Sequence, residues 1–111
     1  MRQWNVNSKL LCRKHLLGEH VELHMFVACL NLKRSIKKYI ETGLVEVHTI
    51  QKRHEELVEE MKRRGYNHQS PLPIFSPVFV GKINVEQNEK ELARRCESCR
   101  NRIGERYDAT G

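Results

Sequence analysis

The chain has 111 residues, of which 39% are hydrophobic and 31% are charged, so its length and composition suit one domain with a small core. The mean hydropathy of -0.66 and the lack of a long apolar run exclude a membrane span, and the first residues lack the pattern of a secretory signal. The formal net charge of +6 at pH 7 is typical of proteins that approach polyanions. We expect a single cytoplasmic domain over residues 1–111.

The first third of the chain predicts an extended lead-in followed by a helix. Residues 1–10 show no helical period, so we expect them to be extended. From residue 11 to about residue 30, apolar side chains recur at steps of three and four, which predicts an amphipathic helix. The next stretch, KRSIKKYI, holds four basic residues and predicts a short basic helix or loop that ends near Gly43.

The remaining elements are a second helix, a connector and a third helix. Residues 44–64 carry the cleanest amphipathic pattern, and Gly65 suits a helix C-cap. All three prolines fall within residues 70–77, which predicts an extended connector, and residues 78–83 could pair briefly as a strand. Asn84 suits the N-cap of a third helix that continues past Ile103. The expected fold is all-α: a compact bundle of three main helices with a basic inter-helix segment and a Pro-rich connector.

The stretch HLLGEHVELH, residues 15–24, combines three histidines and two glutamates at helical spacing. His20 and His24 have the separation of two zinc ligands on a helix, but the glutamate placement of an HExxH motif is missing. We therefore interpret these two histidines as core or rim residues. Glu19 and Glu22 remain as candidate catalytic carboxylates, and for either of them a solvated surface charge is the alternative.

The four cysteines predict metal ligands or free thiols rather than a disulfide framework. The spacings C-x-x-C at 96 and 99 and C-x-x-H at 12 and 15 together give the ligand count of a closed zinc site. Two alternatives stay open, a bridge from Cys96 to Cys99 or Cys12, and free buried thiols. Cys29 is expected in the core. The candidate metal ligands are Cys12, His15, Cys96 and Cys99.

Three motifs, MRQWN, HLLGEHVEL and QKRHEELVEEMKRRGYN, resemble the small phage-type pyrimidine-dimer DNA glycosylases with AP-lyase activity, also called the endonuclease V type. The resemblance covers roughly half of the chain. It implies an all-helical enzyme of DNA repair that acts on double-stranded DNA with a damaged base or an abasic site, through its own N-terminal α-amine.

Carried over residue by residue, the resemblance implies that the Met1 amine is the nucleophile and that Glu22 is the catalytic carboxylate. Val21 and Met25 depart from the family pattern, which has basic residues at both positions, and the family's aromatic C-terminal tail is replaced by CESCRNRIGERYDATG. The other matching positions are Arg2, His15, Arg64, Gly65, Tyr66 and Asn67.

The implied chemistry suits these groups. A Schiff base requires an unprotonated amine, and at pH 7 a far larger fraction of α-amino groups than of lysine amines is neutral. Since Arg2 is bulky, we expect the initiator methionine to be retained. A carboxylate can stabilise cationic character on the sugar and relay protons during imine formation and β-elimination.

Grouped basic residues predict a phosphate-facing surface, and phosphate-dominated binding weakens steeply with salt. Packing is the alternative role for Tyr66, and also for Trp4. The predicted DNA-binding residues are Arg2, Arg13, Lys14, His15, Lys33, Arg34, Lys37, Lys38, Arg63, Arg64 and Tyr66.

The leading hypothesis is a monomeric DNA glycosylase and AP lyase that needs no cofactor for catalysis, with a structural zinc as an option. It would act in the cytoplasm at the nucleoid, or in the host cytoplasm if the protein is viral. One rival is a non-catalytic basic nucleic-acid-binding module, zinc-stapled or not. The other is a metal-dependent nuclease that uses the histidines and carboxylates of the first helix.

Overall fold

Helices supply the regular structure of this computed structural model, which describes residues 1–67 and 70–110, with side chains for 1–67 and 70–105. No strand occurs among these residues, so the all-α prediction is confirmed. None of the described helices has the length and apolar content needed to cross a membrane. The elements are the 3-10 turns η1 (Ser8–Leu10) and η2 (Val47–Thr49) and the helices α1 (Arg13–Asn31), α2 (Lys37–Glu41), α3 (Ile50–Arg63), α4 (Val85–Arg95) and α5 (Glu97–Thr110).

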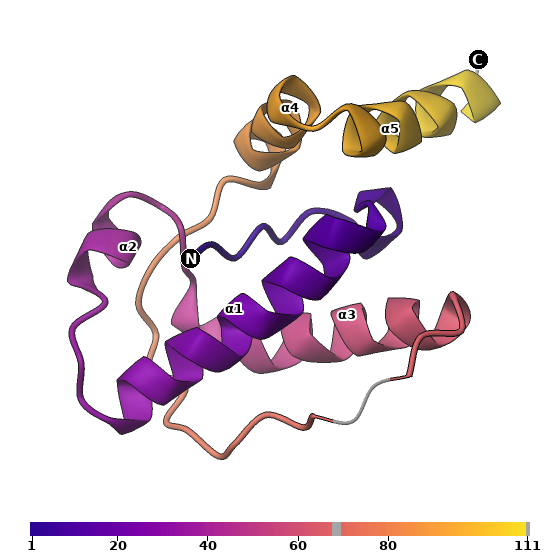
Figure 1. Cartoon of the computed structure of the whole chain (residues 1–111). Helices are drawn as coiled ribbons and strands as arrows, with labels where there is room; N and C mark the ends of the chain where they lie inside the picture. Colours follow the sequence, from indigo (N-terminus) through magenta and orange to yellow (C-terminus); the bar gives the residue numbers. More distant parts are fainter. Residues whose placement is uncertain (68–69, 111) are drawn as a thin grey trace.

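The centre of the molecule is the packing of α1 against α3 (Figure 1). Because apolar residues recur every three or four positions, each helix presents one apolar face to the other. Burial of each large side chain in this interface stabilises the fold by about 1.5–3 kcal/mol. The buried apolar residues are Leu16, Leu23, Phe26 and Val27 of α1 and Ile50, Leu57 and Met61 of α3.

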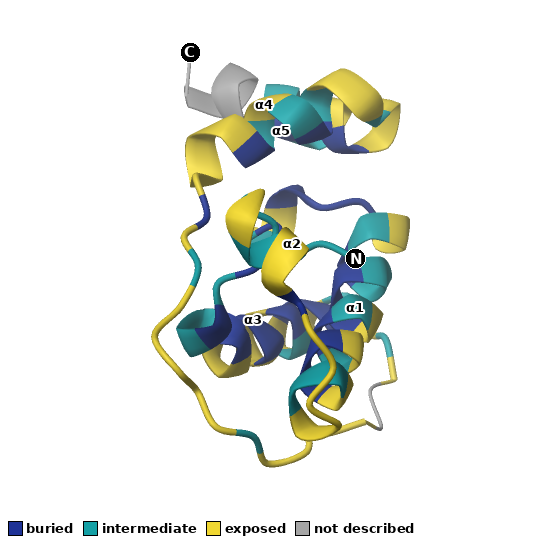
Figure 2. Ribbon diagram, turned by 90° about the vertical axis from the view of Figure 1, so that its left-hand side faces the viewer, coloured by how far each residue is buried: buried dark blue, intermediate teal, exposed yellow. Residues whose placement is uncertain are grey.

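The N-terminal segment runs extended between the α1–α3 pair and the α4–α5 pair (Figures 1 and 2). Gln3 is fully buried and fixes this segment at both its backbone and its side chain. Its N–H donates to the Leu44 carbonyl at 2.8 Å, and its Oε1 accepts from the Glu46 N–H at 2.9 Å. Trp4 is buried, which agrees with its expected packing role. The chain's first residues are therefore held in place.

The strand expected at residues 78–83 is wrong. One backbone hydrogen bond joins this segment to a neighbour, from the Val47 N–H to the Val80 carbonyl at 3.0 Å. The chain then turns at Gly81, whose φ is +88°, and a Cβ there would lie 2.2 Å from the Val45 carbonyl oxygen. Apolar residues at 78–80 are exposed because no strand lies beside them.

The expected third helix is two helices, α4 and α5, that break at Cys96. Cys96 has extended backbone angles, φ −131° and ψ 111°. Its Sγ accepts a hydrogen bond from the Cys99 N–H at 3.4 Å, as an N-cap side chain does at the start of a helix. The period of apolar residues in the sequence continues through Cys96, so this period could not reveal the break between the helices. The two short helices lie together at one side of the molecule (Figure 2).

Candidate active site

A cleft of about 510 Å³ opens where the N-terminal segment, α1 and the end of α4 meet. Met1 and Glu22, the two predicted catalytic residues, both line it. Residues 15, 18, 19 and 22 share one face of α1 because helical residues three or four apart are neighbours. The remaining lining residues are Arg2, Trp4, Lys14, His15, Gly18, Glu19, Leu44 and Arg95.

Glu22 is partly buried and sits in the field of the N-terminal amine. Its burial raises the pKa of the carboxyl group above the ordinary value, while the positive N-terminus and an N–H from the Arg2 backbone oppose the rise. The charge of Glu19 adds to the rise. A carboxyl group with a raised pKa beside an amine is suited to donate and accept protons.

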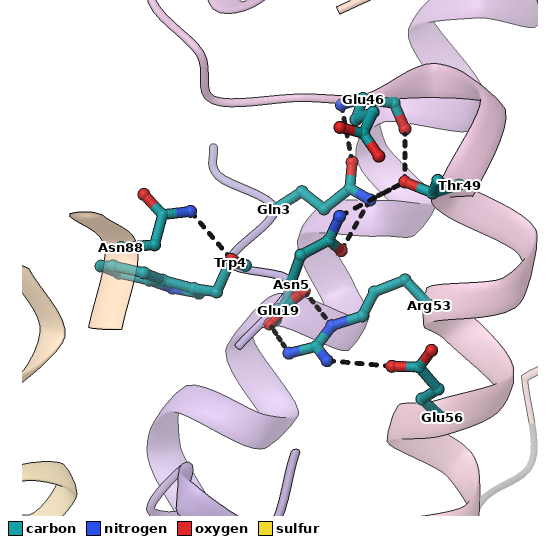
Figure 3. Close-up of polar contacts among 9 residues, drawn as sticks. All are labelled: Gln3, Trp4, Asn5, Glu19, Glu46, Thr49, Arg53, Glu56 and Asn88. Carbon is teal, nitrogen blue, oxygen red and sulfur yellow. Dashed lines mark hydrogen bonds and ion pairs between the residues drawn. The ribbon is translucent and has the colours of Figure 1, made fainter. Parts of the chain in front are cut away.

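Glu19, the competing carboxylate, is bound by a buried arginine (Figure 3). Arg53 of α3 donates from Nε at 2.6 Å and from Nη2 at 2.8 Å, one bond to each oxygen of Glu19. The side chains of the two residues are 2% and 0% exposed, respectively. Arg53 also donates from Nη1 to Glu56 at 3.3 Å. Both Glu19 oxygens are thus occupied, which leaves Glu22 as the cleft carboxylate available for proton transfer.

Arg2, Trp4 and Arg95 form a basic wall of the cleft. The Arg2 guanidinium lies 4.0 Å from the centre of the Trp4 ring, and that of Arg95 lies 5.4 Å from it. Arg2 also donates to Asn88 at 2.7 Å, and Asn88 donates to the Trp4 carbonyl at 2.8 Å. Burial and the nearby Arg95 charge lower the pKa of Arg2, whereas Glu91 opposes them. Arg95 is exposed and also pairs with Glu91 at 2.8 Å. A half-buried arginine and an exposed one beside a cleft attract an anion such as a phosphate.

Some of the predicted DNA-binding residues are in contact with other side chains of the protein, whereas others are exposed to solvent. Arg63 is exposed but donates to the buried carboxylate of Glu60, at 2.7 and 2.5 Å. Arg13 lies 4.8 Å above the ring of Tyr66, which is half-buried against the core. Lys37 is exposed and pairs with the exposed Glu41 at 3.7 Å. The other exposed predicted residues are Lys14 on α1 and Lys33, Arg34 and Lys38 around α2.

Arg64 differs from its expected phosphate-facing position. Its side chain is 7% exposed and pairs with Glu60 at 2.7 Å. Its Nη2 donates to the Leu11 carbonyl at 2.7 Å and to the Ser8 carbonyl at 3.3 Å. Arg64 therefore ties the end of α3 to the turn before α1, a role that requires contacts more than 50 residues apart in sequence.

Cys12, His15, Cys96 and Cys99 converge next to the cleft, and their ligand atoms lie within 4.8 Å of one another. Nδ1 of His15 is 3.2 Å from Sγ of Cys12 and 3.6 Å from Sγ of Cys99, and the Sγ atoms of Cys12 and Cys96 are 3.9 Å apart. In a tetrahedral zinc site two sulfurs lie about 3.8 Å apart, and a sulfur and a nitrogen about 3.5 Å apart. This cluster could hold a metal ion.

Backbone N–H groups point at the sulfurs of this cluster. Cys99 Sγ accepts from the Cys12 N–H at 3.2 Å. Burial raises the pKa of Cys99 to about 12. Burial alone would also raise the pKa of Cys96, but hydrogen bonds from Cys99, Cys12 and the Ser98 backbone lower it overall. His15 has a lowered pKa because of its burial and the charges of Lys14 and Arg95. A neutral imidazole among thiols suits metal coordination.

The sequence interpretation missed Arg53 and Arg95. Arg53 stands at a core-facing position of α3, where an arginine inside an apolar stripe signals a buried partner. Arg95 carried no signal in the sequence, because its approach to Trp4 depends on how α4 packs against the N-terminal segment.

Comparisons with known proteins agree with this geometry. A family model described as pyrimidine dimer DNA glycosylase matches residues 1–73. Searches of curated proteins and of solved structures found no match. The matched residues include the cleft residues on α1 and the N-terminal segment, and they end before α4 and α5.

Proposed function

The chain belongs to the pyrimidine dimer DNA glycosylase family, and on that premise we propose that it excises damaged bases and cleaves the abasic site with the Met1 amine as nucleophile. Glu22 is the catalytic carboxylate in this proposal. The single observation that supports it best is that Met1 and Glu22 line one cleft, where the N-terminal charge acts on the Glu22 carboxyl group.

In the proposed reaction, the neutral amine attacks C1′ of the damaged nucleotide and the C1′–N bond breaks, so the base leaves with the bonding electrons and takes up a proton. Opening of the sugar ring gives an imine between the amine and C1′. A base removes a proton from C2′, and the C3′–O bond breaks with the phosphate as leaving group. Water then hydrolyses the imine and restores the amine. Glu22 supplies and accepts the protons.

Recognition of the DNA rests on charge in this proposal. The target nucleotide must leave the stack, and the distorted duplex is held mainly through its phosphates. Arg2 and Arg95 beside Trp4 are placed to bind the phosphates next to the cleft. The exposed lysines and arginine around α2 extend the positive surface. Arg95 lies outside the residues matched by the family model, so its role belongs to this chain's own C-terminal part.

Borohydride trapping on a duplex with an abasic site tests the nucleophile. Protein with an unmodified N-terminus is expected to form a covalent adduct with the DNA, and N-terminal acetylation should remove the adduct while DNA affinity persists. An adduct that survives acetylation would assign the chemistry to another amine. Binding without an adduct would favour the non-catalytic module, and strand cleavage that EDTA abolishes would favour the nuclease. A duplex with a pyrimidine dimer tests the glycosylase step. The pyrimidine freed from its sugar stays joined to its neighbour in the dimer, so free base should appear only after the dimer is split by light.

We further propose that Cys12, His15, Cys96 and Cys99 hold a structural zinc ion. It would join the start of α1 to the break between α4 and α5, where a small core benefits from a cross-link. Metal analysis of protein purified without added zinc should find zinc, and Cys99→Ser should hold one ion per chain less than the wild type, whereas Cys29→Ser, the matched control, should hold as much as the wild type. A free-thiol count of four in metal-free protein would exclude a disulfide bridge.

A further inference from the structure

Three imidazoles from two helices meet on another side of α1. His20 and His24 lie one turn apart on α1, and His54 lies on α3, which packs against it. The ring centres of His20 and His24 are 4.8 Å apart, those of His20 and His54 are 4.9 Å apart, and those of His24 and His54 are 5.2 Å apart. The three rings therefore surround one point.

We propose that His20, His24 and His54 form a binding site for a late first-row divalent metal ion, of which zinc is the one most available to a cell. One ligand nitrogen of each ring lies within 4.8 Å of the others. Zinc would hold such nitrogens about 3.4 Å apart in a tetrahedral site, so small rotations of the rings suffice to close it. An all-imidazole set selects zinc, copper, nickel or cobalt over magnesium and calcium, which prefer oxygen ligands.

A backbone oxygen stands where a fourth ligand would be. The Ser70 carbonyl oxygen lies 3.1 Å from Nε2 of His24 and 3.3 Å from Nε2 of His54. Both nitrogens thus converge on one oxygen atom. Without metal, each Nε2 carries a proton and donates to that carbonyl, and with metal the deprotonated nitrogens and the oxygen can share the ion. The site would then fasten the Pro-rich connector to α1 and α3.

Two of the three histidines are buried, which is unusual for polar rings and supports a binding role for the cluster. His20 is 9% exposed and His54 is 5% exposed, between two helices whose other buried side chains are mostly apolar. Burying polar rings costs free energy unless their nitrogens have partners, and a metal ion is one partner that all three rings can share. His54 also lines an open cleft of about 550 Å³, together with glutamates and the lysines Lys52 and Lys62, so one side of the cluster adjoins solvent.

The site is separate from the proposed chemistry. Glu22 is two residues from both His20 and His24, which places it about 200° around α1 from each of them. The metal would therefore lie on a different face of the helix from the cleft of Met1 and Glu22, and it would position α1 and the connector rather than meet the DNA. The inference stands whether or not the protein is a glycosylase.

Metal stoichiometry tests the proposal in the full chain. Protein loaded with zinc and freed of excess by gel filtration should hold two ions per chain, one at the cysteine site and one at the histidine site. His24→Asn and His54→Asn should each lower the content by one ion, and His48→Asn, a histidine outside the cluster, should leave it unchanged. His24 is only partly buried, so its variant keeps the test open if His54→Asn fails to fold.

Cobalt distinguishes the two sites by spectroscopy. Thiolate-to-cobalt charge transfer belongs to the cysteine site alone, whereas the histidine site contributes only d–d absorption. His24→Asn should therefore lose part of the d–d absorption and keep the charge-transfer band. If folded His24→Asn and His54→Asn bind as much metal as the wild type, the proposal is overturned. It is equally overturned if Cys99→Ser removes all bound metal while circular dichroism shows an intact fold.

Discussion

At the residue scale, the two glutamates of α1 differ in what surrounds them. Glu19 is buried and bound at both oxygens by Arg53, whereas Glu22 faces the cleft and receives one N–H from the Arg2 backbone. Both are carboxylates on one face of one helix. Arg53 of α3 binds Glu19, which gives Glu19 a structural role. The N-terminus approaches Glu22, which makes Glu22 a candidate for proton transfer.

Glu22→Gln should abolish most turnover and also stabilise the fold at neutral pH. Loss of a general acid–base group lowers rates by about 10²–10⁴-fold. The folded-state pKa of Glu22 is raised, chiefly by burial, so ionisation favours the unfolded chain. Stability is then lost as the pH rises from the unfolded pKa, about 4.3, through the folded pKa. Glutamine does not ionise, so the melting temperature of the Glu22→Gln variant at pH 7 should exceed that of the wild type.

Single-turnover kinetics and thermal melting at pH 4 and pH 7 measure both effects. Glu59→Gln, an exposed position on α3, is the control. Wild-type turnover in a folded Glu22→Gln variant would remove Glu22 from the mechanism. A lower melting temperature of Glu22→Gln at pH 7 would show that neighbouring groups stabilise the Glu22 carboxylate by more than its burial destabilises it.

Glu19→Gln should destabilise the protein by about 3–5 kcal/mol, because it leaves the Arg53 charge buried without its partner. Urea unfolding at pH 7 gives the free energy of unfolding. Glu56→Gln is the matched control, since Glu56 pairs with the same arginine but its side chain is 45% exposed. That variant should lose less than about 1 kcal/mol. Equal losses in the two variants would mean that the buried pair contributes no more than the exposed one.

At the scale of the elements, different faces of α1 contact different parts of the molecule. One face meets α3 through apolar side chains, and another lines the cleft. At its start, Cys12 and His15 meet Cys96, at the break between α4 and α5, and Cys99 of α5. The short helix α2 and the residues before it are held to the core by Ile36, Tyr39 and Ile40 and carry exposed cations on their outer side. This division predicts that α1 controls folding and chemistry, whereas the segment around α2 controls affinity for DNA.

Replacing Arg34 and Lys38 together by glutamine should weaken DNA binding without unfolding the protein, because both residues are exposed. Each lost phosphate contact lowers the slope of log affinity against log salt by about 0.9, so the double variant should lose about 1.8. Fluorescence anisotropy between low and moderate salt measures the slope. Lys52→Gln on α3 is the single-charge control, and its slope should equal that of the wild type. An unchanged slope in the double variant would place the DNA elsewhere.

At the scale of the whole molecule, a few long-range polar contacts join the parts. Asn88 links α4 to the N-terminal segment, and Arg64 with Glu60 links the end of α3 to the residues before α1. The apolar core is small, so these contacts carry a larger share of the stability than they would in a bigger domain. Several of them are charged, which makes the stability of the domain depend on pH.

Acid should destabilise the domain through Glu60. Hydrogen bonds from Arg63 and Arg64 hold the pKa of Glu60 at about 2, against the opposing effect of its burial. A lowered folded-state pKa gives stability that is present above the unfolded value, about 4.3, and is lost as the pH falls toward 2. Glu60→Gln should reduce stability at pH 7 and flatten its dependence on pH between 5 and 2. Urea unfolding at several pH values measures this.

Glu86→Gln is the control for the acid experiment, because Glu86 is 83% exposed and pairs with Lys90, which is 76% exposed. Its unfolding should follow the wild-type pH profile. A steep acid dependence that persists in Glu60→Gln would assign the effect to other carboxylates.

The sequence by itself determined the features that depend on neighbours along the chain. The three-to-four period of α1 and α3, the three prolines of the connector, the cap at Asn84 and the spacing of the cysteine and histidine pairs are local. These gave the all-α class, the main helices and the CHCC cluster, and the family motifs pointed to Met1 and Glu22. Helical periodicity needs only the positions of apolar residues, so no tertiary contact was required.

Only the tertiary structure decided which polar residues meet. Arg53 reaches Glu19 across 34 residues, Asn88 reaches Trp4 across 84, and His54 completes a cluster whose other members lie on α1. The break at Cys96 and the missing strand at residues 78–83 were likewise seen only in the structure, because an apolar period can continue through a break. The position of a side chain in the helical period indicates whether it faces inward, but the residue that it contacts depends on how the helices cross. The physical reason is that burial is a local pattern, whereas pairing is a property of the assembled core.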